Sequence, residues 1–246
     1  MKNKIIRKDN REALSMRPLS FEMDPAEYAE GSCLISYGKT KVLCTATVEE
    51  RVPKWLQGGD SGWVTAEYSM LPRATHTRIR RDKAFSGGRS QEISRLIGRA
   101  LRSCVDLSAI PEKSIVVDCD VLQADGGTRT AAISGGFVAL SRAFDFLKNQ
   151  GAIAKDPMRF QVAGLSSGYV NGELLVDLDY EEDSTCDSDV NFVMTNKKDL
   201  IEVQGTAEGA PFSPQNFAEL IEKTQFAAEV IFQKQREALG IEAKLA

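Results

Sequence analysis

The chain has 246 residues, of which 42% are hydrophobic, and a formal net charge of −4 at pH 7. This length suits one large domain with a sizeable core, and we predict a single domain over residues 1–246. No stretch approaches the roughly 18 consecutive apolar residues of a membrane helix, and residues 1–11 are charged with no apolar run behind them, so we expect a cytoplasmic protein without membrane contact.

The cysteine and histidine content narrows the possible chemistry. The five cysteines form no C-x-x-C pair, and His76 is the only histidine. A zinc site of the usual kind would lack ligands, and a Ser-His-Asp or Cys-His nucleophile would have to use His76. We therefore expect reduced thiols in the core, and the composition argues against covalent hydrolase chemistry.

The first third of the chain is typical of antiparallel strands. Residues 31–48 form two β-rich runs around a turn at residues 37–40, which predicts a hairpin. Residues 63–68 predict a short strand. A helix is predicted after Ser90, taken as its N-cap, because apolar residues then recur at helical spacing as far as Cys104.

The rest of the chain alternates between strands and helices. We predict a strand at residues 114–123, a helix at 130–147, a hairpin of residues 159–166 and 173–180, and a closing helix at 216–239. The Asn-Gly pair in this second hairpin suits a type I′ turn. Each half of the chain thus passes from hairpin to helix, which predicts an α+β fold of two similar halves.

Basic residues are concentrated in one segment. Residues 73–102 contain nine basic and two acidic residues, which leaves 22 basic and 33 acidic residues in the rest of the chain. Such a patch on an acidic body is what selective contact with a polyanion requires. Within it, the four arginines of residues 71–81 could grip an RNA backbone. A subunit interface is the structural alternative, and both hold if RNA crosses that interface.

Two glycine-containing segments lead into predicted helices. In residues 125–129, backbone amides at the start of a helix favour an anion, and Thr128 and Arg129 add a hydroxyl and a cation. In residues 86–89, Arg89 offers a planar fork of donors that matches phosphate oxygens. No Walker A pattern occurs, so a nucleoside triphosphate is not implied. An ordinary capped turn is the alternative for each segment.

Residues 177–189 form an acidic run with seven carboxylates among thirteen residues. Exchange of a phosphodiester builds negative charge on oxygens, so a site needs a divalent cation held by carboxylates or an acid that protonates the leaving group. The run supplies candidates for either role, although its spacing does not choose among them. A solvated acidic loop is the structural alternative.

Five motifs, taken in their order and spacing along the chain, resemble those of a known protein family. They are Leu-Pro-Arg-Ala-Thr-His-Thr-Arg at residues 71–78, Gly-Arg-Ser-Gln-Glu-Ile at 88–93, Asp-Gly-Gly-Thr-Arg-Thr-Ala at 125–131, Glu-Asp-Ser at 182–184 with Asp189, and Glu-Val-Gln-Gly-Thr-Ala-Glu-Gly at 202–209. In this order and spacing they resemble the ribonuclease PH family, over about residues 29–232. The sequence departs from the family at residues 7–12, which lack its usual Arg-Pro-Asp-Gly-Arg, and in a slightly shortened loop before Arg89.

The resemblance implies a fold, an assembly and a reaction. The fold would be the ribonuclease PH fold, with duplicated β-α-β-α halves of the ribosomal protein S5 domain 2-like type, and mixed sheets with packed helices. The assembly would be a homohexameric ring, a trimer of dimers. The reaction would be phosphorolytic 3′-to-5′ trimming of tRNA precursors and other RNA, in which inorganic phosphate is the co-substrate and nucleoside diphosphates are released. In reverse, nucleotides would be added to 3′ ends.

The resemblance also implies roles for individual residues. Phosphate would be bound by Arg89, Gly127, Thr128 and Arg129; catalysis and Mg²⁺ binding would fall to Asp183 and Asp189; and tRNA would be bound near a dimer contact by Arg73, Arg78 and Arg81. Two alternatives remain: a noncatalytic ring subunit that only binds RNA, and a hydrolytic, metal-dependent nuclease that releases nucleoside monophosphates. Retention of the phosphate-binding and carboxylate motifs argues against the first.

Overall fold

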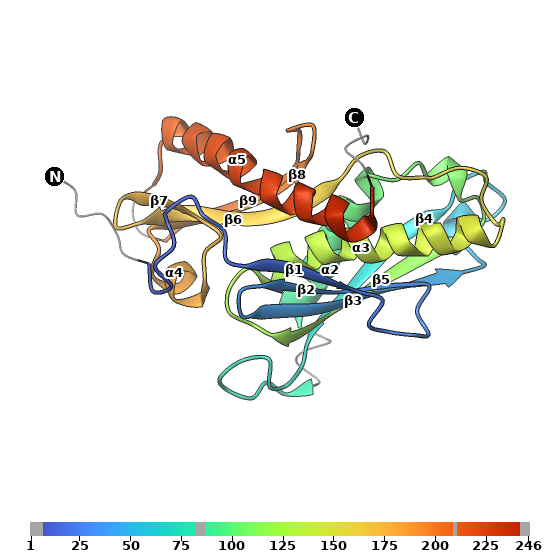
Figure 1. Ribbon diagram of the computed structural model, residues 1–246, viewed down its shortest axis with the longest axis horizontal. Coiled ribbons are helices and arrows are strands. Elements are labelled where there is room, and N and C mark those ends of the chain that lie inside the picture. The colour runs from blue at the N-terminus through green and yellow to red at the C-terminus, as the bar shows by residue number, and fades with distance from the viewer. Residues whose placement is uncertain (1–6, 82–86, 209–210, 242–246) are drawn as a thin grey trace.

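Two β-sheets and the helices packed on them make up the fold in the computed structural model, which describes residues 7–81, 87–208 and 211–241 (Figure 1). The first sheet has the strand order β1-β2-β3-β5-β4. Its strands are β1 (Leu19–Met23), β2 (Gly31–Tyr37), β3 (Thr40–Glu49), β4 (Trp63–Met70) and β5 (Ser114–Gln123). Because β4 and β5 are parallel while the other neighbours are antiparallel, the sheet is mixed, as predicted.

The second sheet is antiparallel, with the order β7-β6-β8-β9. It comprises β6 (Val162–Val170), β7 (Glu173–Val176), β8 (Ser188–Thr195) and β9 (Leu200–Ala207). Asn171 and Gly172 both have positive φ, 49° and 75°, as the predicted type I′ turn requires. Strands β1, β8 and β9 were not predicted from the sequence, whereas β5 has the predicted bounds.

Four described α-helices accompany the sheets: α2 (Gly88–Ser103), α3 (Thr128–Asn149), α4 (Tyr180–Thr185) and α5 (Pro214–Leu239). Two 3₁₀ turns, η1 (Lys54–Leu56) and η2 (Leu107–Ala109), flank β4 and β5. The prediction of Ser90 as an N-cap is wrong. Gly87, in extended conformation, caps α2, and the Ser90 amide already donates to the Gly87 carbonyl inside the first turn.

Helix α3 joins the two sheets (Figure 1). It packs closely because its small residues let strands approach, and a Cβ on Gly135 would lie 2.6 Å from the Ile35 side chain. On its other side the buried Ser134 hydroxyl accepts a hydrogen bond from the Gly164 amide of β6, at 3.0 Å. The hydroxyl of Tyr37, on β2, also donates to Ser134, at 2.9 Å. One helix thus fixes the position of both sheets.

One large cluster of buried hydrophobic side chains extends through both halves of the chain. The halves therefore share a core, which is consistent with one domain, although the assignment of residues 1–246 to a single domain stays a prediction. All five cysteines are buried and unpaired, and burial raises the pKa of Cys33 to about 12, so this thiol stays protonated. None of the described helices is long and apolar enough to cross a membrane.

Candidate active site

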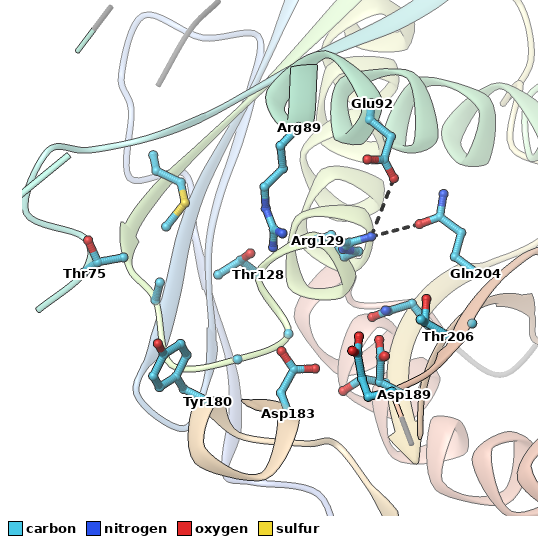
Figure 2. Close-up of a pocket in the computed structure, with 18 of the residues that line it drawn as sticks. Thr75, Arg89, Glu92, Thr128, Arg129, Tyr180, Asp183, Asp189, Gln204 and Thr206 are labelled. Carbon is cyan, nitrogen blue, oxygen red and sulfur yellow. Dashed lines mark hydrogen bonds and ion pairs between the residues drawn. The ribbon is translucent and has the colours of Figure 1, made fainter. Parts of the chain in front are cut away.

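A cavity of about 1110 Å³ lies where the two halves meet (Figure 2). Its walls come from the end of β4, the segment after it, the start of α2, the loop before α3, helix α4, and strands β8 and β9. All six residues predicted to bind phosphate or to catalyse line this cavity: Arg89, Gly127, Thr128, Arg129, Asp183 and Asp189. Segments far apart in the chain thus converge on one space.

The loop before α3 requires glycine at two positions. Gly126 and Gly127 have φ of 77° and 66°, in the left-handed region that glycine adopts without strain. A Cβ on Gly126 would also lie 2.5 Å from the backbone carbon of Asp179, so this loop packs directly on the start of α4. Gly127 is the N-cap of α3, and its carbonyl accepts a hydrogen bond from the Thr130 hydroxyl at 2.9 Å.

Two side chains hold this loop from behind. The Thr40 hydroxyl donates to the Gly126 carbonyl at 2.6 Å and accepts from the Asp125 amide at 2.9 Å. The Arg17 guanidinium donates to the carbonyls of Asp125 and Gly126. The start of α3 is therefore fixed before any anion arrives, as a preorganised anion site requires.

The residues that follow the glycines are positioned by side chains of β4, α2 and β9. The hydroxyls of Thr128 and Tyr68 lie 2.8 Å apart, and burial raises the pKa of Tyr68, so its phenol stays neutral and able to donate. The Arg129 guanidinium donates to the side-chain carbonyl of Gln204 at 2.9 Å and lies 3.8 Å from the Glu92 carboxylate (Figure 2). Arg129 is thus oriented but not neutralised by a close ion pair within the described residues.

Arg89 lies in the first turn of α2 and its side chain extends toward Thr128 and Arg129 (Figure 2). The N-terminal ends of α2 and α3 therefore face the same part of the cavity, each with an arginine beside it. Helix N-termini carry partial positive charge, and arginine matches the geometry of phosphate oxygens. This part of the cavity is suited to an inorganic phosphate.

The two carboxylates reach the cavity from the second half. Helix α4 lies inside the acidic run, and its N-cap Asp179 forms a capping box with Glu182, which fixes the helix that carries Asp183. Asp189 lies on β8. Partial burial raises the pKa of the Asp183 carboxyl, although the side chain still reaches solvent. Burial and the neighbouring charge of Asp183 raise the pKa of Asp189, so the two carboxylates are close enough to repel.

This pair fits a divalent cation of the kind predicted. Mg²⁺ is usually held by one or two carboxylates together with substrate phosphate oxygens, rather than by a cage of protein ligands. Asp183 and Asp189 provide two such carboxylates on the wall of the cavity that faces the phosphate-suited part. Within the described ranges no group of three His, Cys, Asp or Glu side chains gathers to form a complete metal site, so the remaining ligands would come from RNA, phosphate and water.

The predicted RNA-binding arginines lie outside the cavity. The segment of residues 71–81 contributes Thr75, His76, Thr77 and Ile79 to the lining, whereas Arg73, Arg78 and Arg81 are exposed and do not line it. These arginines are exposed on a segment that lines the cavity, and their role stays a prediction. The shortened loop before Arg89 lies partly outside the described residues.

Sequence reasoning missed a group of buried arginines in the N-terminal segment. Arg7 donates to both carboxylate oxygens of Glu182, at 2.7 and 2.6 Å, and Arg17 donates to both oxygens of Asp177, at 3.0 and 2.7 Å. Arg11 bonds to each carboxylate, at 3.0 and 3.1 Å. We call these five residues the arginine–carboxylate network.

This network links the two sides of the cavity. Because Arg17 also reaches the glycine loop and Glu182 belongs to α4, the network ties the predicted phosphate loop to the helix that carries Asp183. Burial alone would raise the pKa of Asp177, but the Arg17 and Arg11 charges and hydrogen bonds lower it below its usual value. Asn10 has φ of 61° in the turn between the first two arginines, at the place of the glycine in the Arg-Pro-Asp-Gly-Arg pattern.

Comparisons with known proteins decide the family. Residues 15–144 match the model of the 3′ exoribonuclease family, domain 1, and residues 161–225 match domain 2 of that family. The chain belongs to the 3′ exoribonuclease family. It is 53% identical over 227 residues to a protein named Ribonuclease PH from Methylobacterium sp. (strain 4-46), covering 92% of this chain and 96% of that one.

Solved structures agree with the fold. Rice (Oryza sativa) Rrp46 superimposes with a TM-score of 0.76 at 21% identity, covering 95% of this chain and 100% of that one. A chain of the Archaeoglobus fulgidus exosome with RNA bound to the active site gives 0.75 at 24% identity, covering 93% and 92%. The predicted ribonuclease PH fold and the predicted enzyme class, a phosphate-dependent 3′-to-5′ exoribonuclease of this family, are confirmed.

Proposed function

We propose that the cavity is the phosphorolytic active site and that its residues have the roles predicted from the sequence. Arg89, Gly127, Thr128 and Arg129 bind the attacking phosphate, and Asp183 and Asp189 are the catalytic carboxylates and hold Mg²⁺. The observation that carries this proposal is the convergence of two helix N-termini, each with an arginine, and two carboxylates on the same cavity. Each feature alone has an ordinary structural explanation, whereas the combination matches the charges of phosphoryl transfer.

The geometry supports an in-line exchange at phosphorus. Three oxygens of the phosphate are held by the start of α3, the Thr128 hydroxyl and the two arginines, while the fourth attacks the 3′-terminal phosphodiester. The new bond joins this oxygen to phosphorus, and the bond from phosphorus to the 3′-oxygen of the preceding nucleotide breaks; that oxygen takes up a proton. The products are a nucleoside diphosphate and a shortened RNA. When bound by the carboxylates, Mg²⁺ supplies positive charge that stabilises the phosphate oxygens.

The exchange replaces one phosphate linkage by another, so its equilibrium is nearly balanced. Excess nucleoside diphosphate drives 3′ extension. The natural substrates are tRNA precursors and other RNA 3′ ends, whose backbone is bound by Arg73, Arg78 and Arg81 at the rim, near a dimer contact. The protein works in the cytoplasm as a homohexamer, a trimer of dimers. The name of the bacterial relative and the RNA bound to the related archaeal exosome support RNA as the substrate.

Phosphate dependence is the test of the reaction. The purified protein is incubated with a tRNA that bears a short 3′ extension and with Mg²⁺, with and without inorganic phosphate, and the released nucleotides are separated by chromatography. We expect nucleoside diphosphates that appear only with phosphate. Nucleoside monophosphates released without phosphate would instead identify a hydrolytic nuclease, and RNA binding without any product would identify a noncatalytic ring subunit.

A carboxylate variant tests the residue roles in the same assay. Asp189→Asn keeps the shape of the side chain but removes its charge, so we expect turnover to be abolished while RNA binding is retained. Asp187→Asn is the matched control, because Asp187 is an exposed carboxylate two residues earlier that does not line the cavity. Full activity of the Asp189 variant would refute its assigned role.

A further inference from the structure

The cavity is larger than a phosphate and two carboxylates need. Pockets that hold a drug-sized ligand have volumes of roughly 300–1,000 Å³, and this cavity has about 1110 Å³. Its charged residues lie toward one side. Figure 2 shows Arg129 and Asp189 on that side, Tyr180 and Thr75 on the opposite one, and Arg89 and Asp183 between them. The second side has no role in the exchange described above.

This opposite side has a different chemical character. Met70, Thr75 and Ala124 line it, and they are neighbours because the Ala124 amide donates to the Ala74 carbonyl at 2.8 Å and the Leu71 amide donates to the Val121 carbonyl at 3.0 Å. The lining residues from 70–79, together with Ala124 and Tyr180, include no arginine, lysine or carboxylate. This side suits a flat, uncharged group rather than a phosphate.

Among the described residues, Tyr180 is the tyrosine, phenylalanine or tryptophan that lines this side. Tyr180 is 56% exposed and lines the cavity, so its ring can be reached by a ligand. No residue that the structure describes makes a hydrogen bond or ring contact with the Tyr180 side chain, so the ring has no evident structural task. Its backbone is fixed, because Tyr180 is the first residue of α4 after the capped Asp179 and a Cβ on Gly126 would lie 2.8 Å from its amide nitrogen.

The position of Tyr180 relates it to the reacting phosphate. Asp183 lies three residues later on α4, so both side chains project from the same face of this helix. A nucleotide whose phosphate lies beside Asp183 would therefore place its sugar or base near the Tyr180 ring. Stacking of bases on aromatic rings is tolerant of sequence, because every base has a flat face.

We propose that Tyr180 is a subsite of the cavity that Met70 and Ala124 also line, on which a nucleobase of one of the last two nucleotides of the RNA stacks. This inference rests on the proposed function and deepens it. The subsite binds the RNA end without reading its sequence, which a trimming exonuclease needs because each cycle presents a different base. The hydroxyl of Thr75, on the same side, is already engaged with the Thr77 carbonyl at 2.6 Å, so it does not select a base by donating to it.

RNAs that lack a single base test this subsite. Three substrates of equal length are compared: an intact RNA, one whose terminal nucleotide has a ribose without a base, and one with the same change at the penultimate nucleotide. With the wild-type protein we expect kcat/KM to fall roughly 5- to 150-fold for one of the two altered RNAs, the range expected for removal of a base–aromatic stack. With Tyr180→Ala we expect a similar decrease on intact RNA and no further decrease when that base is removed.

Two further variants separate stacking from other roles. Tyr180→Phe keeps the ring and should behave as wild type; a decrease equal to that of Tyr180→Ala would assign the role to the hydroxyl and overturn the proposal. Tyr28→Ala is the matched control, because Tyr28 is 96% exposed and does not line the cavity. The KM for phosphate should stay within about twofold in Tyr180→Ala, and a rise as large as the effect on RNA would mean that Tyr180 only positions α4, which also overturns the proposal.

Failure of the stacking subsite can be told apart from failure of the proposed phosphorolytic reaction. If the wild-type protein released no nucleoside diphosphate, the proposed reaction would fail, and the subsite would then be tested by the affinity of the three RNAs for the wild type and for Tyr180→Ala. An equal penalty for base removal in both proteins, at both positions, overturns the stacking subsite whether or not phosphorolysis occurs.

Discussion

The arginines of the N-terminal segment and those of residues 71–81 have opposite environments. The side chains of Arg7, Arg11 and Arg17 are 1%, 7% and 4% exposed, and each has a carboxylate partner. By contrast, Arg73 and Arg78 are exposed, on a segment whose neighbouring residues line the cavity. Burial with a fixed partner makes the first set part of the framework, whereas exposure leaves the second set available to an incoming polyanion.

Arg129 lies between these two extremes. Its side chain is 19% exposed, and it is held by Gln204 and faces the cavity. An arginine that binds a ligand reliably has to be oriented without being neutralised. The comparison therefore predicts that stability depends on the buried set, phosphate use on Arg129, and RNA affinity on the exposed set.

The largest effect on folding should come from Asp177. We expect Asp177→Asn to lower the free energy of unfolding by about 3–5 kcal/mol, because it leaves the buried charge of Arg17 without a carboxylate partner and removes one of the carboxylates that pair with Arg11. Asparagine tolerates the left-handed backbone at this position, where φ is 55°, so loss of charge rather than strain is tested. Urea denaturation followed by circular dichroism measures the change.

The control for this variant is Asp60→Asn, since Asp60 is an exposed carboxylate in the loop before β4. It should leave the free energy of unfolding within about 0.5 kcal/mol of wild type. Equal stability of the two variants would contradict a structural role for the arginine–carboxylate network.

The next effect concerns phosphate. We expect Arg129→Ala to lower kcat/KM for phosphate roughly 10²- to 10³-fold, because the substitution removes a preorganised donor to the transition state. Arg129→Lys should recover only part of this, since lysine keeps the charge but not the planar fork. Phosphate titration of the trimming rate measures both variants.

Arg95→Ala is the matched control, because Arg95 is an exposed arginine on α2 that does not line the cavity. It should change kcat/KM for phosphate by less than about threefold, in line with the small effects of surface substitutions. If Arg129→Ala changed the rate no more than Arg95→Ala, the phosphate would have to bind elsewhere.

The parts of the site that the sequence predicted are local. The Asp-Gly-Gly-Thr-Arg loop joins a strand to a helix within a few residues, and both its anion-binding features and its glycine requirement can be read from that stretch alone. The charge segregation likewise pointed to the exposed arginines. Helix α4 was missed, although Asp179 followed three residues later by Glu182 is a capping-box pattern that could have revealed it.

The arginine–carboxylate network could not be predicted in the same way. Arg7 and Glu182 are separated by 175 residues, and Arg17 and Asp177 by 160, so no local pattern pairs them. The Arg-Lys-Asp-Asn-Arg opening was interpreted as a departure from the family, whereas Asn10 adopts the positive φ that a glycine would take there. Strand β8 was missed although Asp189 and Asn191, which line the cavity, alternate with the buried Val190 and Phe192, a period-two pattern that could have revealed it.

The smallest effect per residue should come from the exposed set, and it should depend on salt. We expect replacement of Arg73, Arg78 and Arg81 by alanine to weaken tRNA binding and to lower the slope of log affinity against log salt by roughly one for each phosphate group that the protein no longer neutralises. Stability should not change, because these side chains are exposed. Arg51→Ala, an exposed arginine paired with Glu49, is the control and should leave the slope unchanged. If the triple variant kept the wild-type slope but sedimented as a smaller assembly, these arginines would join subunits rather than bind RNA. The exposed set would then have a structural role, as the buried set does.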